Sequence, residues 1–303
     1  MNEKAGNKNK TQQTRTAAEL QGKSSARKAI LIEALSYIGK FRGKVVLVKY
    51  GGAAQIRDDL KKGFAQDMVL LHSLGMLPVI VHGGGPEVNR AIKAMGGEPV
   101  FIDGQRVTTS ESLAIAEMVL SGSVNKDLVA LLNSNGAKAV GISGKDGNLI
   151  RAKKLVRRDG LDLGHVGEVD HVEPEVVRLL LDNGHIPVIS PIAMDEGGNT
   201  LNVNADSVAA RIASAMKAEK IIFMTDVDGV MDEGRRISNI NADGALKLIN
   251  DGVITGGMVP KVDAMIHCLR SGVGSAQIIN GSEEHSIIAE LFTDEGIGTK
   301  IVP

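Results

Sequence analysis

The sequence predicts an α/β protein built around a largely parallel sheet. Two observations carry this prediction: short apolar runs rich in β-branched residues alternate with stretches of helical periodicity, and glycine-rich or polar segments follow directly on several of the runs. With 303 residues, the chain is long enough for one large α/β domain or two lobes, and a core of that size needs no disulfides. No fixed-period repeat is visible, which disfavours a solenoid.

An amphipathic helix comes first, over residues 25–41. Its apolar side chains recur at helical spacing with most charged side chains opposite them, and they are Ile30, Leu31, Ala34, Leu35, Tyr37, Ile38 and Phe41. Strands are then predicted at 45–50, 78–83, 139–144, 186–192, 220–227 and 276–281. Helices are predicted near 57–75, 86–95, 110–121, 124–135, 174–184, 204–216, 243–251 and 258–272.

Two segments depart from this alternation. Residues 1–24 are polar and almost free of large apolar side chains, so they bury too little to offset the entropy of ordering. We expect a disordered tail there, with a short organelle transit peptide as the alternative. Residues 148–172 carry short segments separated by turns, which predicts an inserted hairpin pair or meander.

Composition and charge argue against several classes of function. The formal net charge of -1 gives no sign of a polyanion-binding surface, and Trp is absent, so nucleic acid is a poor partner. The single Cys268 cannot form an internal disulfide, which fits a reducing compartment, and we expect it on a buried helix face. No apolar run approaches the roughly 20 residues of a membrane span, so we expect a soluble, cytoplasmic protein.

Glycines and polar residues gather at one predicted edge of the sheet. Those that end or directly follow an apolar strand are Lys49, His82, the glycines at 83–85, residues 143–147 and residues 225–229. The carboxyl ends of parallel strands share an edge, and ligands in open α/β sheets bind there. Any one of these glycines alone is better explained as a turn residue, but their co-occurrence favours a binding site.

The motif HGGGPEV is the strongest local signal for phosphate. A strand leads into three glycines and then into a helix with Pro86 in its first turn, so exposed amides and the positive helix end favour an anion. KYGG offers the same device with Lys49 at its mouth. The P-loop, the complete dinucleotide fingerprint and the protein-kinase signatures are missing. Without HExxH or a Cys/His cluster, we expect no metal held by the protein, only Mg²⁺ carried in by nucleotide phosphates.

Eight motifs in sequence order resemble the amino acid kinase superfamily, and within it the acetylglutamate kinases of arginine biosynthesis. They are KYGG, HGGGPEV, DGQRVTT, GISGKDG, GHVGEV, NVNAD, TDVDGV and GGMVPK, and the resemblance runs from residue 27 to the end. It implies a three-layer αβα sandwich around a central, mostly parallel open sheet that two lobes share. The N-lobe, residues 42–215, would bind acetylglutamate and dimerise. The C-lobe, residues 216–303, would bind ATP and the effector arginine.

The resemblance also implies roles for single residues. Lys49 and Lys261 would stabilise negative charge on the transferring phosphoryl group, and Asp206 would hold the two ammonium groups in position. The substrate-binding residues would be Gly84, Gly85, Arg106 and Asn202. The nucleotide-binding residues would be Gly51, Gly52, Thr225, Asp226, Val227, Gly229 and Met231. For Asp206 a purely structural role stays open, since Asn204 or Asp206 could cap the helix that follows.

The chemistry suits these residue types. The γ-carboxylate of N-acetyl-L-glutamate, near pKa 4.3 unperturbed, is already ionised at neutral pH, so no general base is needed to create the nucleophile. What opposes reaction is the approach of one anion to another. Paired lysines, Mg²⁺ and glycine amides would therefore act by alignment and charge stabilisation.

The predicted first helix adds a regulatory hypothesis. It resembles the arginine-inhibited members of the family, in which such helices interlace dimers into a hexamer, a trimer of dimers. The effector site would then include Tyr37, Glu290, Gly296 and Gly298. Gln277 departs from the histidine expected in that group, and Ala53 from the usual asparagine, which puts arginine inhibition in doubt. A signal protein of the PII type is a further candidate partner.

Two alternatives stay open. One is a related carboxylate kinase acting on aspartate, glutamate or a carrier-bound aminoadipate, although Arg106 and Asn202 argue against aspartate. The other is a non-catalytic arginine sensor on the same scaffold. The sensor is disfavoured because a pure binder has no need of two lysines with a shared aspartate.

Overall fold

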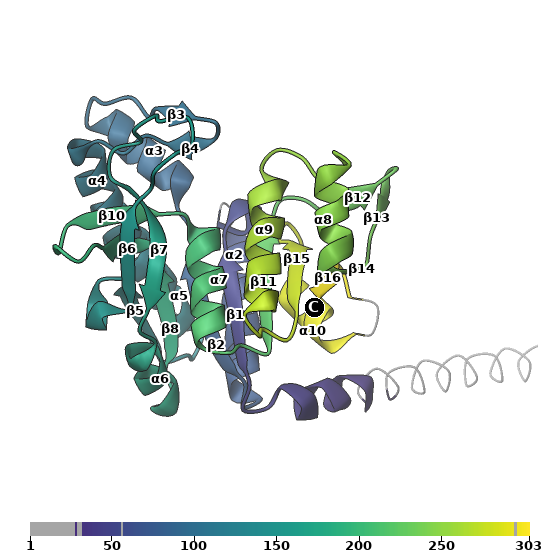
Figure 1. The fold of residues 1–303 in the computed structure, drawn as a ribbon. Helices are drawn as coiled ribbons and strands as arrows, with labels where there is room; N and C mark the ends of the chain where they lie inside the picture. The colour runs from purple at the N-terminus through teal and green to yellow at the C-terminus, as the bar shows by residue number, and fades with distance from the viewer. Residues whose placement is uncertain (1–27, 29–31, 56, 294–295) are drawn as a thin grey trace, which may run out of the picture.

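An eight-stranded sheet organises the computed structural model, which describes residues 28, 32–55, 57–293 and 296–303 (Figure 1). The predicted tail at 1–24 lies outside the described residues. Six neighbouring strands are parallel, and the edge pair β14 and β16 runs the opposite way. The order is β14 (Asn239–Asn241), β16 (Thr299–Val302), β15 (Ala276–Asn280), β11 (Lys220–Thr225), β1 (Val45–Tyr50), β2 (Leu77–His82), β8 (Ile186–Ser190) and β5 (Ala139–Ser143).

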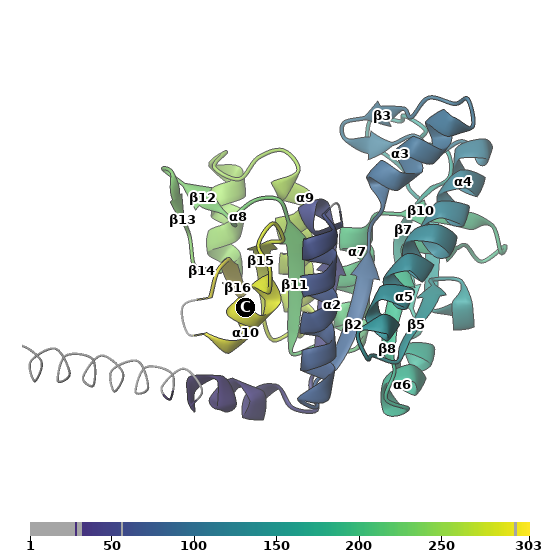
Figure 2. The same ribbon diagram turned by 180° about the vertical axis from the view of Figure 1, so that it is seen from behind.

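Helices cover both faces of this sheet, which gives the three layers (Figures 1 and 2). One face carries α6 (Glu175–Asp182), α7 (Ala205–Ala215), α8 (Ala242–Asn250) and α9 (Met258–Arg270). The other carries α2 (Asp58–Ser73), α5 (Asn125–Ser134) and α10 (Ser286–Phe292). The predicted α/β sandwich with a mostly parallel sheet is confirmed. Of these elements, α10, β14 and β16 were absent from the sequence-based prediction.

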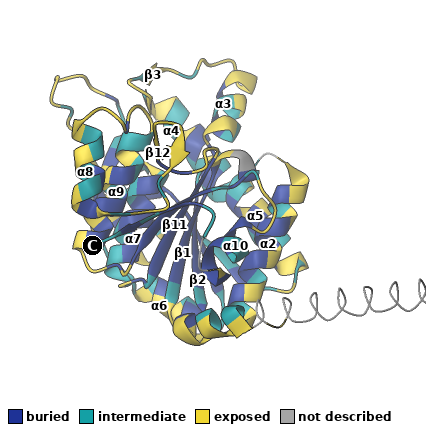
Figure 3. Ribbon diagram, turned by 90° about the vertical axis from the view of Figure 1, so that its right-hand side faces the viewer, coloured by how far each residue is buried: buried dark blue, intermediate teal, exposed yellow. Residues whose placement is uncertain are grey.

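Alternation along the strands explains the two cores. In β1, Leu47 packs toward α7 and α9, whereas Val46 and Val48 pack toward α2. All three side chains are buried, as Figure 3 shows for the central strands. Lys49 is on the same face as Leu47, because side chains two apart along a strand point the same way. The strand therefore delivers its lysine toward α7.

A small closed barrel forms the insertion beside the main sheet. The predicted hairpin in 148–172 is confirmed as the antiparallel pair β6 (Ile150–Lys154) and β7 (Val166–Val172). Strands β9 (Ile192–Met194) and β10 (Thr200–Val203) complete the barrel. Two short hairpins lie outside it: β3 (Phe101–Ile102) with β4 (Gln105–Arg106), and β12 (Met231–Asp232) with β13 (Arg235–Arg236).

The remaining helices flank the glycine loops. A 3-10 turn, η1 (Gly52–Gln55), follows β1, and α3 (Gly85–Ala94) follows β2. A second 3-10 turn, η3 (Asp146–Asn148), follows β5. Two separate helices were predicted at 110–121 and 124–135, but α4 (Ser110–Glu117) continues into α5 through the π-helical segment η2 (Met118–Val124). A π segment within a helix often marks a functional site.

The N-terminal helix is present over residues 32–41. Phe41 is buried, and Ala34, Tyr37 and Ile38 pack partly against the α2 side of the core. Leu35, which the periodicity placed on the same apolar side, is 64% exposed in the single chain. The predicted start of this helix and Ile30 and Leu31 lie outside the described residues. Within the described chain, no helix is long and apolar enough to cross a membrane.

Candidate active site

The two glycine loops meet in one cavity at the carboxyl ends of β1, β2 and β11. It has a volume of about 370 Å³, and its lining consists of Lys49, Gly51, Gly52, Gln55, Gly83, Gly84, Gly85, Pro86, Glu87 and Asp226. The expectation that these segments share one edge is therefore confirmed. Gln55 and Glu87 were missed as lining residues, although each lies within three residues of the last glycine of its loop.

A lysine from each half of the chain reaches the same carboxylate. Lys49 Nζ, at the end of β1, lies 2.9 Å from Asp206 Oδ1 in an ion pair. Lys261 Nζ, on α9, donates a hydrogen bond of 2.6 Å to Asp206 Oδ2. Asp206 lies in the first turn of α7, which packs beside α9 (Figure 1). The side chains of Lys49 and Asp206 are only 11% and 10% exposed, so this charge cluster is largely shielded from water.

The electrostatics of Asp206 are set by two opposing effects. Burial would raise the pKa of its carboxyl group, but the ammonium groups of Lys49 and Lys261 outweigh burial and hold that pKa below its usual range. The carboxylate is thus ionised at neutral pH. Its capping alternative is excluded, because the Asn204 side chain accepts from the N–H groups of Asp206 and Ser207 and is itself the cap of α7.

Gly51 leaves the room that the Lys49 ammonium occupies. A Cβ atom at position 51 would lie 2.8 Å from Lys49 Nζ, closer than van der Waals contact allows. Gly52 has a positive φ of 67° and passes close to the backbone of Thr225 and Asp226. These two glycines therefore shape the cavity sterically.

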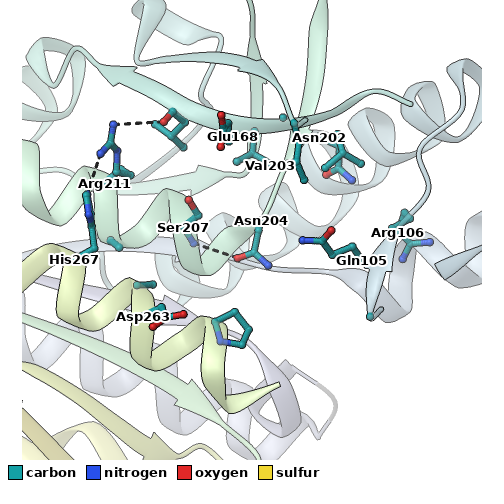
Figure 4. A pocket seen from close by; sticks show the side chains of 18 of the residues that line it. Gln105, Arg106, Glu168, Asn202, Val203, Asn204, Ser207, Arg211, Asp263 and His267 are labelled. Carbon is teal, nitrogen blue, oxygen red and sulfur yellow. Dashed lines mark hydrogen bonds between the residues drawn. The ribbon is translucent and has the colours of Figure 1, made fainter. Parts of the chain in front are cut away.

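A larger cavity of about 610 Å³ lies between the barrel, α7 and α9 (Figure 4). The predicted substrate residues Arg106 and Asn202 both line it. Arg106 Nη2 donates to Gly85 O at 3.2 Å, which links this cavity to the glycine loop. Arg106 Nη1 is buried with no hydrogen-bond partner among the described residues, so one donor is available for an anionic ligand. Asn202 Nδ2 is 3.4 Å from Thr108 Oγ1.

The far end of this cavity carries a contact between α7 and α9. Arg211 Nη1 donates to His267 Nε2 at 2.9 Å, as Figure 4 shows, and Nη2 donates to Asp170 O at 2.9 Å. Burial, with a smaller effect of the guanidinium, lowers the pKa of His267. Since the guanidinium of Arg211 can only donate, Nε2 accepts its hydrogen bond and His267 is neutral here.

The predicted nucleotide residues divide into two groups. Gly51, Gly52 and Asp226 line the smaller cavity, whereas Thr225, Val227, Gly229 and Met231 are not among its lining residues. Thr225 ends β11, and its Oγ1 donates to Asp226 Oδ1 at 3.1 Å. Val227 and Met231 are about 40% exposed on the same side. Gly229 passes against Thr299, with φ of 137°.

All four predicted effector residues line a third cavity, of about 280 Å³. Tyr37 comes from the N-terminal helix and Glu290 from α10, and Gly296 and Gly298 lie between α10 and β16. Glu290 Oε2 accepts from the N–H groups of Ile297 and Gly298, so it also shapes this loop. Further charged lining residues are Lys40, Glu219, Lys220 and Lys300. Burial lowers the pKa of Lys220 to about 8.

Gln277 and Cys268 are both buried. Gln277 Oε1 lacks a hydrogen-bond partner in the described chain, while Nε2 donates to Ser275, which lines the third cavity. Cys268 lies on the inner face of α9, as predicted, and burial raises its pKa to about 12. The thiol is therefore a poor nucleophile at neutral pH.

Comparisons with known proteins show which family and which relatives this chain matches. Residues 44–280 match the model of the amino acid kinase family. The acetylglutamate kinase of Campylobacter hominis is 50% identical over 280 residues, covering 92% of this chain and 98% of that protein. The acetylglutamate kinase of Persephonella marina is 49% identical, covering 90% and 97%.

Solved structures share the fold. The N-acetylglutamate synthase of Neisseria gonorrhoeae, complexed with coenzyme A and N-acetyl-glutamate, superposes with a TM-score of 0.81 at 30% identity. The match covers 91% of this chain but only 63% of that one. Carbamate kinase from Giardia lamblia, bound to AMP-PNP, superposes with a TM-score of 0.62 at 17% identity, a likeness of fold alone.

Proposed function

Since the chain belongs to the amino acid kinase family and is a phosphotransferase with a carboxyl group as acceptor, we propose that it phosphorylates the γ-carboxylate of N-acetyl-L-glutamate with ATP, in arginine biosynthesis. One observation carries the proposal more than any other. Lys49, which is buried, and Lys261, which is 20% exposed, bring two positive charges onto the carboxylate of Asp206, beside a cavity lined by glycine amides.

The chemistry requires charge control more than proton transfer. A γ-carboxylate oxygen attacks the γ-phosphorus, the bond from that phosphorus to the β,γ-bridging oxygen breaks, and ADP leaves with the electron pair. No proton must move to create the nucleophile, because the carboxylate is ionised at neutral pH. The two ammonium groups offset the charge that accumulates on the transferring group, and Asp206 keeps them from repelling each other out of position.

Residues that line the two cavities would orient the substrate. Arg106, with its unpartnered Nη1, suits a substrate carboxylate, since a guanidinium pairs well with that group. Asn202 would hold the acetylamino group, and Gly84 and Gly85 would present amides from the N-terminus of α3. We assign nucleotide contacts to Gly51, Gly52, Thr225, Asp226, Val227, Gly229 and Met231.

Mg²⁺ enters this proposal as the companion of ATP. Within the described chain, no group of three or more His, Cys, Asp or Glu side chains is placed to hold a metal ion. Glu87 and Asp226 nevertheless put acidic oxygens on the smaller cavity, and Glu87 Oε2 is buried without a hydrogen-bond partner among the described residues, which suits a cation carried by phosphates. A divalent ion bound there would reduce the negative charge that the phosphates present to the incoming carboxylate.

The third cavity supports feedback inhibition by arginine. Its lining combines acidic Glu219 and Glu290 with basic Lys220 and Lys300, which suits a ligand that carries one carboxylate and a cationic side chain. Tyr37 links this cavity to the N-terminal helix, whose exposed Leu35 supports the interlaced hexamer that the resemblance implies. We further propose that the protein is cytoplasmic, that its two lobes meet at 215/216 and that a signal protein of the PII type binds it.

Two experiments test these proposals. ADP release is measured with N-acetylglutamate, glutamate, aspartate or no acceptor, each with and without arginine. ADP release with N-acetylglutamate but not with the other acceptors supports the proposed reaction. Preference for another acceptor identifies a related carboxylate kinase. A protein that binds arginine but turns over none of the acceptors is a sensor. The number of chains per particle is then compared for the full chain and a variant lacking residues 1–40, and an unchanged number contradicts interlacing.

A further inference from the structure

Two side chains contact the carbonyl oxygen of Gly83, a residue that lines the smaller cavity. His82 Nδ1 lies 2.9 Å from Gly83 O, and Gln55 Nε2 donates to the same oxygen at 3.3 Å. His82 itself is fully buried at the end of β2 and is not among the residues that line the smaller cavity. Its ring is therefore unavailable to substrate, but it contacts the peptide that begins the glycine loop.

Asn125 fixes which ring nitrogen of His82 carries the proton. Asn125 Nδ2 lies 3.0 Å from both His82 Nε2 and Val188 O, and Lys126 Nζ donates to Asn125 Oδ1 at 3.0 Å. Because Val188 O requires a donor and Lys126 requires an acceptor, the amide has only one workable orientation. Nε2 must then accept, which leaves the imidazole proton on Nδ1, facing Gly83 O.

Burial keeps this imidazole neutral. It lowers the pKa of His82 to about 4, against a smaller opposing effect of the hydrogen bond to Gly83. The one charged group that contributes to this shift is Lys126, which lowers the pKa further. At neutral pH the ring therefore carries a single proton, and Nδ1 donates it to Gly83 O.

The π-helical segment η2 brings these parts together. Asn125 follows its last residue, and Leu120 and Val124 within it pack directly on the glycine loop. A Cβ atom on Gly84 would lie 2.7 Å from Leu120 Cδ2 and 3.3 Å from Val124 Cγ2. The same segment thus supports Gly84 sterically and supplies the amide that orients His82.

The direction of the Gly83 carbonyl determines the direction of the next N–H. In a trans peptide the two groups point opposite ways, and the described chain has no cis peptide bonds. With the carbonyl directed at the ring of His82, the Gly84 N–H points away from that ring. No protein acceptor takes it among the described residues, and Gly84 lines the cavity beside Lys49.

We propose that His82, held by Asn125 as its Nδ1-protonated tautomer, is a positioning residue that aims the Gly84 N–H at the phosphoryl group being transferred. This rests on the proposed function, since it concerns the same reaction. The donor acts where charge develops in the transition state, so its misalignment lowers kcat more than it raises KM.

A matched pair of variants tests the role of His82. In His82→Asn the amide nitrogen can replace Nδ1 and still donate to Gly83 O, whereas in His82→Gln it can replace only Nε2. Acyl phosphate is trapped with hydroxylamine at saturating ATP and N-acetylglutamate. We expect His82→Gln to lower kcat about 100-fold and His82→Asn less than about tenfold, with little change in the KM for N-acetylglutamate in either. Equal losses of kcat in both variants would overturn the proposal.

The tautomer is measured directly in the unmodified protein by ¹⁵N NMR of the histidine rings, which avoids any failure of the variants to fold. The expected result is a His82 ring protonated on Nδ1 alone between pH 6 and 8, since its pKa is lowered to about 4. A ring protonated on Nε2, or on both nitrogens, contradicts it. If the unmodified protein forms no acyl phosphate, the proposed function fails, while the NMR result still decides the tautomer.

Discussion

Lys49 and Lys261 place their ammonium nitrogens on the two oxygens of one carboxylate, at 2.9 and 2.6 Å. Two like charges are thereby held close together in a site where water is largely excluded. At an effective dielectric constant near 20, a unit charge at 4 Å contributes about 4 kcal/mol, or roughly three decades of rate if the interaction arises mainly in the transition state. The two ammonium groups are thus close enough together to stabilise a second anionic group, which in the proposed reaction is the phosphoryl group being transferred.

Asp206→Asn tests the link between this cluster and stability. The pKa of Asp206 lies below its unfolded value, so its stabilising contribution is present above about pH 4 and is lost as pH falls through the folded pKa. We expect Asp206→Asn to lower the free energy of unfolding by about 3 kcal/mol at pH 7, because the buried Lys49 and the partly buried Lys261 lose their shared partner. The difference from wild type should shrink toward acid pH in urea titrations. Asp58→Asn, at an exposed helix start, is the control; a difference that does not change with pH would refute the assignment.

Gly51→Ala tests the space reserved for Lys49. The new Cβ would displace the Lys49 ammonium, so we expect kcat to fall about 100-fold with only a small change in thermal stability, since the end of a flexible side chain can move. Gly39→Ala, which meets no atom within 4 Å, is the control and should retain wild-type kcat. Full activity of Gly51→Ala would show that the observed position of Lys49 is unimportant.

His82 gives the protein a specific sensitivity to acid. Its pKa is about 4 in the folded state and about 6.5 when unfolded, so between these values the unfolded chain binds the extra proton. Stability should therefore fall by about 1.4 kcal/mol per pH unit as pH drops from 6.5 to 4, on account of this residue. His82→Asn should lack that component in denaturant titrations. Identical slopes in the two proteins would mean that His82 is not buried and neutral.

Much of the fold could be predicted from the sequence. Apolar runs such as VVLVKY identified the central strands, because a buried parallel sheet demands continuous β-branched and aliphatic residues. The edge strands β14 and β16 and the seven-residue α10 were missed, since two are only three or four residues long and the third has too few turns to show a period. The π segment was also missed, because the prediction placed a break at 122–123, between two helices, where the structure continues as one helix.

The candidate site, like the fold, could be predicted only in part. Lys49 and the glycine loops could be found because residue type and position at strand ends carry the signal, whereas the role of Asp206 came from the resemblance to the family. Their convergence depends on the packing of α7 beside α9, which no local pattern encodes. The His82 to Asn125 contact joins residues 43 positions apart, and HGGG alone placed His82 at the ligand edge without revealing that its ring turns inward.

Lys220 tests the proposed arginine site. Burial lowers its pKa to about 8, so the charge that would pair with the carboxylate of arginine is lost as pH rises through that value. Inhibition by arginine should therefore weaken between pH 7 and 9, and Lys220→Met should weaken it most at pH 7, where Lys220 is charged. Lys217→Met, at an exposed neighbouring position, is the control. Inhibition that stays constant with pH, or persists in Lys220→Met, would argue against this site.

The most direct test of the account is the turnover of Lys49→Ala and Lys261→Ala, measured as acyl phosphate formed at saturating ATP and N-acetylglutamate. We expect each variant to lose about 1,000-fold in kcat while its KM values change less than about tenfold, because the ammonium groups act mainly in the transition state. Lys93→Ala, on the exposed side of α3, should behave as wild type. Near-normal kcat in both lysine variants would contradict the central claim that the two charges stabilise the transferring phosphoryl group.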